Sequence, residues 1–251
     1  MIECTNIYKN YGAISVLKGI SLNVAEQETF TVIGPNGAGK TTLFKVLTGE
    51  IPANSGTVTF KGEDITRLSA SARVHRGFGR TFQVARVLPS NSVLENIVIA
   101  LEARARQIER GPLRQLRPTG RIKDEAVEVA RRISLANKLD VPARFLSHGD
   151  RKRLELGITL ALKPKILMMD EPTAGMSPSD RNATIDIILH VKDEDCLTIM
   201  LTEHDMDVVS QLSDRIMVMN YGETIAVGTL SEIRENAAVR DIYLGEEIGD
   251  A

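Results

Sequence analysis

The hydrophobic positions along the chain fall into short runs of two kinds. Apolar runs such as Thr29–Ile33 and Ile166–Met169 have the length of buried strands. Runs with apolar residues three or four positions apart, such as Ser179–Val191, are typical of helices that pack one face on a core. Because strands and helices alternate, the pattern predicts parallel strand pairing through right-handed crossovers, which is the α/β class.

Individual elements can be placed from the same pattern. Residues 1–32 show partial alternation, with Gly12 and Gly19 at turn points, which predicts strands. The other predicted strands are Ser55–Gly62 with its leading turn, Lys165–Met169, Leu197–Leu201 and Arg215–Met219. The predicted helices outside the middle of the chain are Thr41–Thr48, Arg151–Leu162, Ser179–Val191 and Met206–Leu212.

The middle of the chain, residues 86–146, has a different character. Residues 93–109 and 123–133 have helical periodicity and dense charge. Gly111-Pro112 and Pro118-Thr119-Gly120 are expected to interrupt helix formation between them. The pattern therefore predicts a helical insert with a loop in its middle, whereas the last residues, 230–251, are polar and mixed.

Composition excludes several classes of protein. With 251 residues, 43% of them hydrophobic and 25% charged, the chain suits one large globular α/β domain or one with a modest insert. A net charge of −2 provides no basic field for nucleic acid, so no nucleic-acid partner is expected. Cys4 and Cys196 lack the spacing of a metal site or disulfide framework, which favours a reducing cytosol.

The sequence also bears on the membrane. The N-terminal residues lack a basic start followed by an apolar run, so no signal peptide is expected. No apolar run reaches the roughly 20 residues that a spanning helix needs. If the protein serves a membrane process, we expect it to dock on a membrane partner.

One segment carries clear chemistry. Gly34-x-x-x-x-Gly39-Lys40-Thr41 follows a predicted strand and opens a predicted helix, which is the context of a phosphate-binding loop rather than of a chance glycine turn. Its N–H groups would form a nest for phosphate at the helix N-terminus. Lys40 would reach the β- and γ-phosphates, Thr41 would bind Mg²⁺, and Thr42 would bond the α-phosphate. The residues expected to contact ATP here are Asn36, Gly37, Ala38, Gly39, Lys40, Thr41 and Thr42.

A pair of acids follows a second buried strand. Asp170 ends the apolar run and Glu171 comes next. An acid at the carboxyl end of a parallel strand faces the ligand crevice of an α/β sheet. Asp170 is suited to hold Mg²⁺ through its water shell, and Glu171 to polarise the attacking water. Taken alone, the pair is equally compatible with an acidic turn before Pro172, but beside a phosphate loop it indicates ATP hydrolysis.

Further motifs stand in a recognisable order. About 20 residues before the acidic strand stands the segment Leu146-Ser147-His148-Gly149-Asp150. Gln83 lies earlier in the chain than this segment, and His204 follows the strand that comes after the acidic one. This order of phosphate loop, glutamine loop, signature, acidic strand and histidine resembles that of the ATP-binding-cassette (ABC) ATPases. The resemblance covers roughly residues 1–245.

The resemblance implies roles for these residues. Two subunits would close head to tail, so that Ser147 and the amide of Gly149 touch the γ-phosphate held by the partner. Tyr11 would stack on adenine, and Gln83 would sense Mg²⁺ and link to a membrane subunit. His204 would contact the γ-phosphate and orient both water and the catalytic carboxylate. A strand-end tyrosine, a loop glutamine and a lone histidine each have an ordinary structural interpretation as well.

This chain departs from the family pattern at three positions. His148 replaces a glycine, Asp150 replaces a glutamine, and Ser177, in Ala174–Ser177, replaces the usual aspartate of a loop that crosses to the partner. Because the two γ-phosphate contacts of the signature are retained, we expect hydrolysis to survive. We expect Asp150 to weaken contact with the partner's ribose, and His148 to add a pH-sensitive group.

The implied fold is that of a P-loop ABC ATPase. It has a mixed or parallel core sheet, an N-terminal antiparallel β-subdomain and a helical subdomain insert. The expected divisions are residues 1–85 and 151–235 for the two parts of the catalytic core, 86–150 for the helical subdomain and 236–251 for the tail.

A subset of motifs points further within the family. Four segments resemble the corresponding segments in the ATPases of bacterial importers for branched-chain and other hydrophobic amino acids. They are Gly79–Gln83, Val93–Asn96, Glu203–Met206 and the tail Val239–Glu246. Relatives serve urea, short amides and aromatic acids, and a lipopolysaccharide-export ATPase shares a similar tail, so these alternatives stay open. The helical segment 100–122 favours the amino-acid group.

Partners follow from the same resemblance. They are a second ATPase subunit, identical or different, integral membrane permeases and, indirectly, a periplasmic binding protein, with the chain at the cytoplasmic face of the bacterial inner membrane. The tail residues Ile242, Tyr243 and Leu244 are expected either to cap the core or to contact a partner. Two rival classes are a non-transport cassette ATPase and a small P-loop kinase. The first usually has two cassettes or a coiled-coil insert, and the second would not need the signature or His204.

Overall fold

A computed structural model of the chain describes residues 1–108 and 119–241. Its strands form two sheets. The smaller sheet is antiparallel, in the order β2-β1-β4-β5. Its strands are β1 (Ile2–Tyr11), β2 (Ile14–Val24), β4 (Ser55–Phe60) and β5 (Glu63–Asp64).

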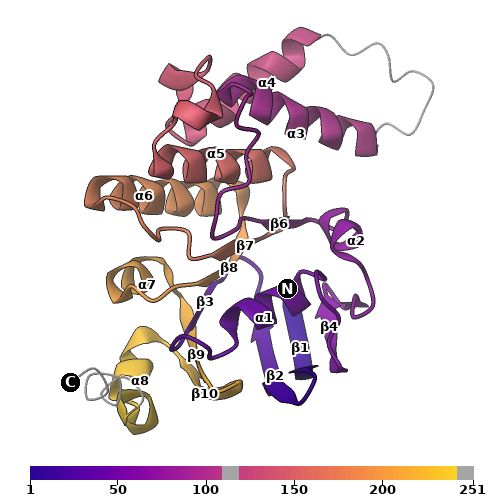
Figure 1. The fold of residues 1–251 in the computed structure, drawn as a ribbon, viewed down its shortest axis with the longest axis vertical. Helices are drawn as coiled ribbons and strands as arrows, with labels where there is room; N and C mark the ends of the chain where they lie inside the picture. The colour runs from indigo at the N-terminus through magenta and orange to yellow at the C-terminus, as the bar shows by residue number, and fades with distance from the viewer. Residues whose placement is uncertain (109–118, 242–251) are drawn as a thin grey trace.

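The larger sheet has the order β10-β9-β3-β8-β7-β6 (Figure 1). Its strands are β3 (Thr29–Ile33), β6 (Phe78–Arg80), β7 (Ile166–Asp170), β8 (Thr198–Thr202), β9 (Arg215–Asn220) and β10 (Glu223–Gly228). Every pairing in it is parallel except that of β10 with β9. The carboxyl ends of five strands therefore meet at one edge, where ligands bind in open α/β sheets.

Helices cover both faces of the larger sheet. They are α1 (Lys40–Leu47), α2 (Ala70–Val74), α5 (His148–Ala161), α6 (Pro178–Asp195), α7 (Met206–Leu212) and α8 (Leu230–Glu235). Alternate residues of β7 enter separate cores: Ile166 and Met168 pack with α1, whereas Leu167 and Met169 pack with α5 and α6. This alternation follows from the two-residue repeat of a strand. It places α1 and α5 on opposite faces of the sheet.

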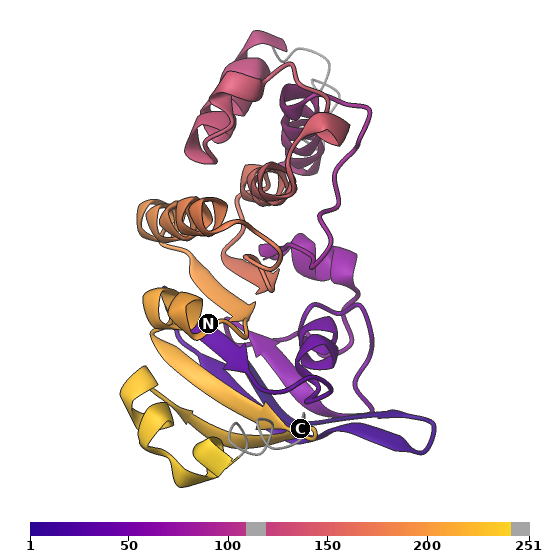
Figure 2. The ribbon, with the colours of Figure 1, turned by 60° about the vertical axis from the view of Figure 1, so that its left-hand side comes forward.

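The middle of the chain forms a helical segment beyond α5, at the top of Figures 1 and 2. It contains α3 (Val93–Ile108), α4 (Thr119–Arg132) and the short 3₁₀ turns η2 (Ala136–Lys138) and η3 (Ala143–Phe145). Arg104 connects α3 of this segment to α4 and to α5, because its guanidinium pairs with Glu125 of α4 over 2.7 Å and donates to the Ala161 carbonyl of α5 over 2.6 Å. The predicted helical insert is thus present.

The predicted strands and helices are present, with ends that agree to within a few residues. The strand Thr29–Ile33 and the helix Met206–Leu212 have the predicted ends. The expectation that Thr119-Gly120 interrupts a helix is wrong, because α4 begins at Thr119. The other predicted breakers, Gly111-Pro112 and Pro118, lie outside the described residues, as do Ile242, Tyr243 and Leu244 of the tail.

Several buried polar or thiol groups have clear environments. Arg73, 2% exposed, donates to the Val46 and Leu47 carbonyls at the C-terminus of α1, and burial lowers its pKa to about 10. Burial also raises the pKa of the Cys4 thiol to about 12, whereas Cys196 is exposed at the end of α6.

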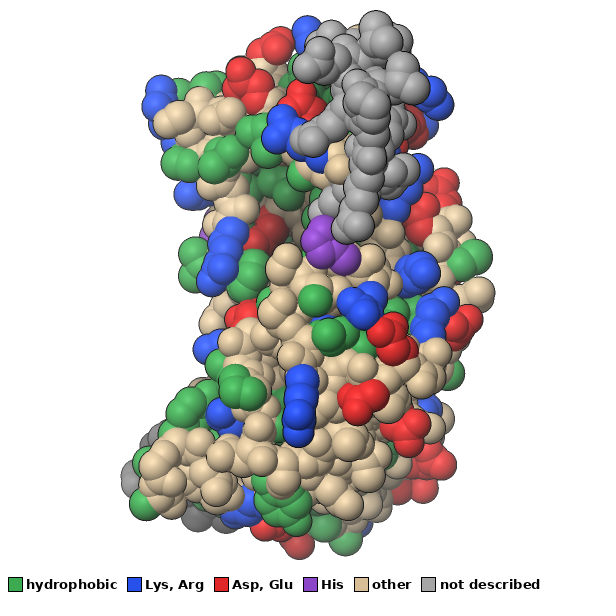
Figure 3. Space-filling model, turned by 90° about the vertical axis from the view of Figure 1, so that its right-hand side faces the viewer, with side chains coloured by type: hydrophobic (Ala, Val, Ile, Leu, Met, Phe, Trp, Pro, Cys, Tyr) green, Lys and Arg blue, Asp and Glu red, His purple; other side chains and the backbone are tan. Residues whose placement is uncertain are grey.

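The surface is mixed in charge. On the face shown in Figure 3, Lys and Arg side chains are interspersed with Asp and Glu side chains. Of the helices in residues 1–108 and 119–241, none combines the length and the apolar character of a membrane span.

Candidate nucleotide site

The phosphate loop joins the carboxyl end of β3 to α1. Gly34, Gly37 and Gly39 have φ values of +146°, +83° and +102°, a region that favours glycine. A Cβ at Gly34 would lie 2.1 Å from the Met219 carbonyl oxygen, so the loop can approach β9 only with glycine there. The N-cap position of α1, Gly39, provides no side-chain cap. The first N–H groups of α1 are therefore not capped by a side chain, and such groups bind phosphate well.

The other loop residues are placed to line such an anion. Lys40 is 9% exposed, and its ammonium donates to the carbonyl oxygens of Gly34 and Pro35 across the loop. Three of the other loop residues are exposed, namely Asn36, Gly37 and Thr41, whereas Ala38 is buried and Thr42 is half-buried. The turn between β9 and β10 contacts the phosphate loop, because Gly222 donates its N–H to the Ala38 carbonyl over 3.0 Å.

Asp170 lies at the carboxyl end of β7, 6% exposed. Its Oδ1 accepts a hydrogen bond from Thr202 Oγ1 over 2.7 Å, and its Oδ2 lies 3.9 Å from a guanidinium nitrogen of Arg80. Carboxylate and hydroxyl oxygens are ligands that Mg²⁺ accepts, and α1, which carries Thr41, packs against β7. The donor set of this edge thus fits a magnesium ion.

Two of the predicted site residues, Gln83 and His204, converge on the carboxylate of a third, Glu171. Gln83 Nε2 donates to Glu171 Oε2 over 3.2 Å. His204 Nδ1 lies 3.8 Å from Glu171 Oε1. These residues come from the loop after β6, the end of β7 and the loop after β8. The fold therefore brings together at the strand ends three side chains that are far apart in sequence.

The backbone of Glu171 is unusual. Its φ of +47° lies in the left-handed region, which is unfavourable for a residue with a side chain. The N–H of Glu171 donates to the Thr202 backbone carbonyl over 3.2 Å and to Thr202 Oγ1 over 3.1 Å. Such strained residues persist only where their surroundings hold them, and they cluster at functional sites.

Tyr11 lies at the end of β1, at the tip of the β1–β2 hairpin. It is 49% exposed, and Lys9 Nζ lies 5.3 Å from its ring centroid. The β2 residues Val16 and Leu17 flank the phosphate loop, since a Cβ at Gly39 would lie 3.0 Å from each. The hairpin that carries the Tyr11 ring therefore borders the loop.

The signature residues lie elsewhere. Ser147 is the N-cap of α5, where its Oγ accepts the Asp150 N–H over 3.0 Å, and it is exposed. Gly149 packs so closely on α6 that a Cβ would lie 2.9 Å from Asp180 Cγ. Because α5 and α1 cover opposite faces of the sheet, Ser147 and Gly149 begin a helix on the other face from the one that follows the phosphate loop.

The three departures from the family pattern contact groups of this chain. His148 Nε2 lies 3.2 Å from the Ala174 carbonyl oxygen. Ser177 is the N-cap of α6; its Oγ accepts the Asp180 N–H over 3.2 Å and donates to Asp180 Oδ2 over 2.9 Å. Ser177 thus stabilises the start of a helix.

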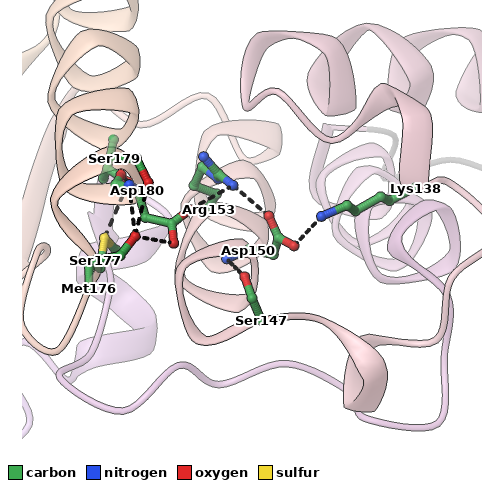
Figure 4. A network of polar contacts seen from close by, with 9 residues as sticks. Lys138, Ser147, Asp150, Arg153, Met176, Ser177, Ser179 and Asp180 are labelled. Atoms are coloured by element: carbon green, nitrogen blue, oxygen red, sulfur yellow. Dashed lines mark hydrogen bonds and ion pairs between the residues drawn. The ribbon is translucent and has the colours of Figure 1, made fainter.

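Asp150 is the centre of the polar network in Figure 4. Its carboxylate pairs with Lys138 of η2 and with Arg153 of α5, and Arg153 lies 3.4 Å from Asp180 Oδ1 of α6. Burial by itself would raise the pKa of Asp150, but hydrogen bonds from Lys138 and Arg153 outweigh it and hold the pKa below its ordinary value. With 2% exposure, this carboxylate is occupied within its own chain.

Sequence reasoning missed Arg80, Lys152, Glu155 and Thr202, which surround the predicted residues. Burial lowers the pKa of the Lys152 ammonium and raises that of the Glu155 carboxyl, and polar groups around each oppose the shift. For Lys152 and Glu155 the sequence did contain a signal for a buried, partnered charge. Both residues stand among Leu154, Leu156 and other apolar residues of a predicted helix. Long charged side chains in such a stretch are rarely buried unless paired.

Comparisons with known proteins identify the family to which this fold belongs. A family model described as ABC transporter matches residues 17–174, and one described as branched-chain amino acid ATP-binding cassette transporter matches residues 223–248. The chain is 35% identical to the high-affinity branched-chain amino acid transport ATP-binding protein LivG of Salmonella typhimurium, over 98% of each. It is 30% identical to the lipopolysaccharide export system ATP-binding protein LptB of Haemophilus influenzae, over 98% of each.

A crystal structure of an ATP-binding cassette of an ABC transporter in its ADP conformation superimposes with a TM-score of 0.83 at 32% identity, over 98% of each chain. Fold and site together define a P-loop ATPase cassette. The chain belongs to the ABC transporter family, as a subunit that binds and hydrolyses ATP.

Proposed function

We propose that the chain energises import of branched-chain or related hydrophobic amino acids across the bacterial inner membrane, from its cytoplasmic face. The similarity to LivG over 98% of both chains carries this proposal, and the match of residues 223–248 to the branched-chain cassette model supports it. Export of lipopolysaccharide is the second candidate, favoured by the 30% identity to LptB.

The proposed chemistry is hydrolysis of ATP by an activated water molecule. Lys40 and the N–H groups of the loop bind the β- and γ-phosphates, and Tyr11 stacks on adenine. Glu171 polarises the water, and His204 stabilises the charge that develops on the γ-phosphate. Mg²⁺, held by Thr41, Asp170 and Gln83, would neutralise phosphate charge.

The assembly is part of the same proposal. Residues 1–85 and 151–235 form the catalytic core, 86–150 the helical subdomain and 236–251 the tail. Ser147 and Gly149 complete the nucleotide site of a second cassette subunit, and the loop of Gln83 contacts membrane permeases. ATP closes this dimer because its γ-phosphate has contacts on both subunits only in the closed state.

The experiment is reconstitution in vesicles with the candidate permeases and binding protein. We expect ATP hydrolysis to rise when the binding protein is loaded with leucine, isoleucine or valine, and to stay basal with urea. A Lys40→Ala subunit serves as the control without hydrolysis. Stimulation by urea, or by lipopolysaccharide in an export complex, would overturn the amino-acid assignment but leave the ATPase assignment standing.

A further inference from the structure

Two buried charged side chains of α5 take no part in the chemistry proposed above. Lys152 and Glu155 are 6% and 4% exposed. They are three residues apart, so they are neighbours on one face of the helix. Burying a charge is costly unless it is well partnered. The partners of these two groups therefore indicate what the groups do.

Lys152 holds the backbone of Glu171. Its Nζ donates to the Glu171 carbonyl oxygen over 2.7 Å, and the Ala174 N–H donates to the same oxygen over 3.2 Å. Glu171 has the unfavourable φ of +47°, so it needs such contacts to keep its conformation. Since the backbone sets the direction of its side chain, the bond from Lys152 helps to fix where the carboxylate points.

Glu155 holds the loop that carries Gln83. Its Oε2 accepts the Phe82 N–H over 3.3 Å, and its Oε1 accepts the Arg86 N–H over 2.8 Å. The two N–H groups lie on either side of Gln83. The same loop exposes 78% of Val84 and 48% of Leu88 to solvent. A partner that moves this loop would therefore pull directly on the Glu155 carboxylate.

We propose that Lys152 and Glu155 are positioning residues that make α5 a mechanical link between the loop 81–88 and the backbone of Glu171. This link acts beside the direct bond from Gln83 to the Glu171 carboxylate. The inference rests on the proposed function, in which Glu171 activates water and the loop contacts membrane subunits. Because α5 begins at the exposed Ser147, the same helix also connects the partner's nucleotide to this carboxylate.

The first test measures kcat and KM for Mg-ATP on the full-length chain. Lys152→Met removes the donor but fits a buried site, so we expect kcat to fall about tenfold with KM changed less than about twofold. Lys152→Arg keeps a cationic donor and should recover most of the rate. Lys123→Met makes the same chemical change at an exposed position of α4 and should match wild type.

The second test asks whether Lys152 and Glu155 act together. Glu155→Gln keeps one acceptor oxygen and turns an amide NH₂ toward the other N–H, so hydrogen exchange at Phe82 or Arg86 should quicken and kcat should fall. The double variant should lose little more than the worse single variant, because the link is already broken. If the fold-losses in kcat of the two single variants multiply in the double variant, the two residues act separately, and that result would overturn the proposed link.

The outcomes separate this inference from the proposed function. If wild type hydrolyses no ATP, the proposed function fails. If wild type is active and Lys152→Met keeps kcat within about twofold, the inference alone fails. It also fails if Lys152→Met loses hydrolysis, ADP binding and thermal stability together without recovery in Lys152→Arg, because that result indicates a structural role.

Discussion

At the scale of single residues, Glu171 has a partner at every polar group. Its N–H contacts Thr202, its carbonyl contacts Lys152, and its carboxylate faces Gln83 and His204. The carboxylate is thus oriented before any substrate binds. Groups held in this way need little reorganisation during a reaction, which is why preorganised polar sites favour catalysis.

Asp150 carries the prediction at this scale. Asp150→Asn leaves Lys138 and Arg153 without their carboxylate, and we expect the free energy of unfolding to fall by about 2 kcal/mol at neutral pH. Because the folded pKa of Asp150 is depressed, its stabilisation is present above the ordinary carboxyl pKa and is lost as pH falls through the depressed value. The deficit should therefore shrink in acid, as measured by urea unfolding.

A matched control for that experiment is Asp140→Asn, an exposed aspartate of the same segment. It should change the free energy of unfolding by less than about 0.5 kcal/mol. A deficit of Asp150→Asn that stays constant into acid would contradict the ion-pair explanation.

The sequence order predicted Gln83, Glu171 and His204, and the structure brings these side chains together. It did not predict the contacts of Asp150 or Lys152. Those contacts join residues 12 and 19 positions apart and depend on how α5 packs against η2 and the end of β7. A local pattern records that a residue is charged and lies among apolar neighbours, but the partner comes from tertiary packing.

At the scale of elements, strong periodic runs were predicted with nearly correct ends. The sequence did not predict β10 or β6, because neither has the run of apolar residues that marks a buried strand. β10 is an antiparallel edge strand in which no residue is fully buried, so it lacks the apolar run of a central strand. β6 is only three residues long and includes Gly79. α5 begins three residues before the predicted Arg151, because Ser147 caps it.

The cap of α6 gives the prediction at this scale. Ser177→Ala removes the oxygen that accepts the Asp180 N–H, and we expect unfolding free energy to fall by about 1 kcal/mol. Ser177→Thr retains the hydroxyl and should stay close to wild type. Denaturant unfolding of the three proteins makes the comparison, and equal stability of the alanine and threonine variants would show that the cap contributes nothing.

At the scale of the whole molecule, the two halves of the predicted nucleotide site lie on opposite faces of one sheet. The phosphate loop leads into α1, whereas Ser147 and Gly149 begin α5. The geometry therefore supports the proposed head-to-tail pair of subunits.

Dimerisation is the prediction at this scale. Glu171→Gln should bind Mg-ATP and lose hydrolysis by about a hundredfold or more, because the amide cannot accept a proton from water. Without hydrolysis the closed pair should persist, so the variant should sediment as a dimer with Mg-ATP and as a monomer with ADP. Glu235→Gln, an exposed change on α8, should hydrolyse ATP normally. Normal turnover by Glu171→Gln would refute the assignment of the base.

The different exposure of the two cysteines has a practical consequence for measurements on a dimer of subunits. Cys4 is buried with a thiol pKa of about 12, whereas Cys196 is exposed. A maleimide reagent at neutral pH should therefore label one position per chain. In a pair of identical subunits, spin labels on the two Cys196 thiols would report the separation of the subunits through a catalytic cycle, in the natural sequence and without engineered attachment points.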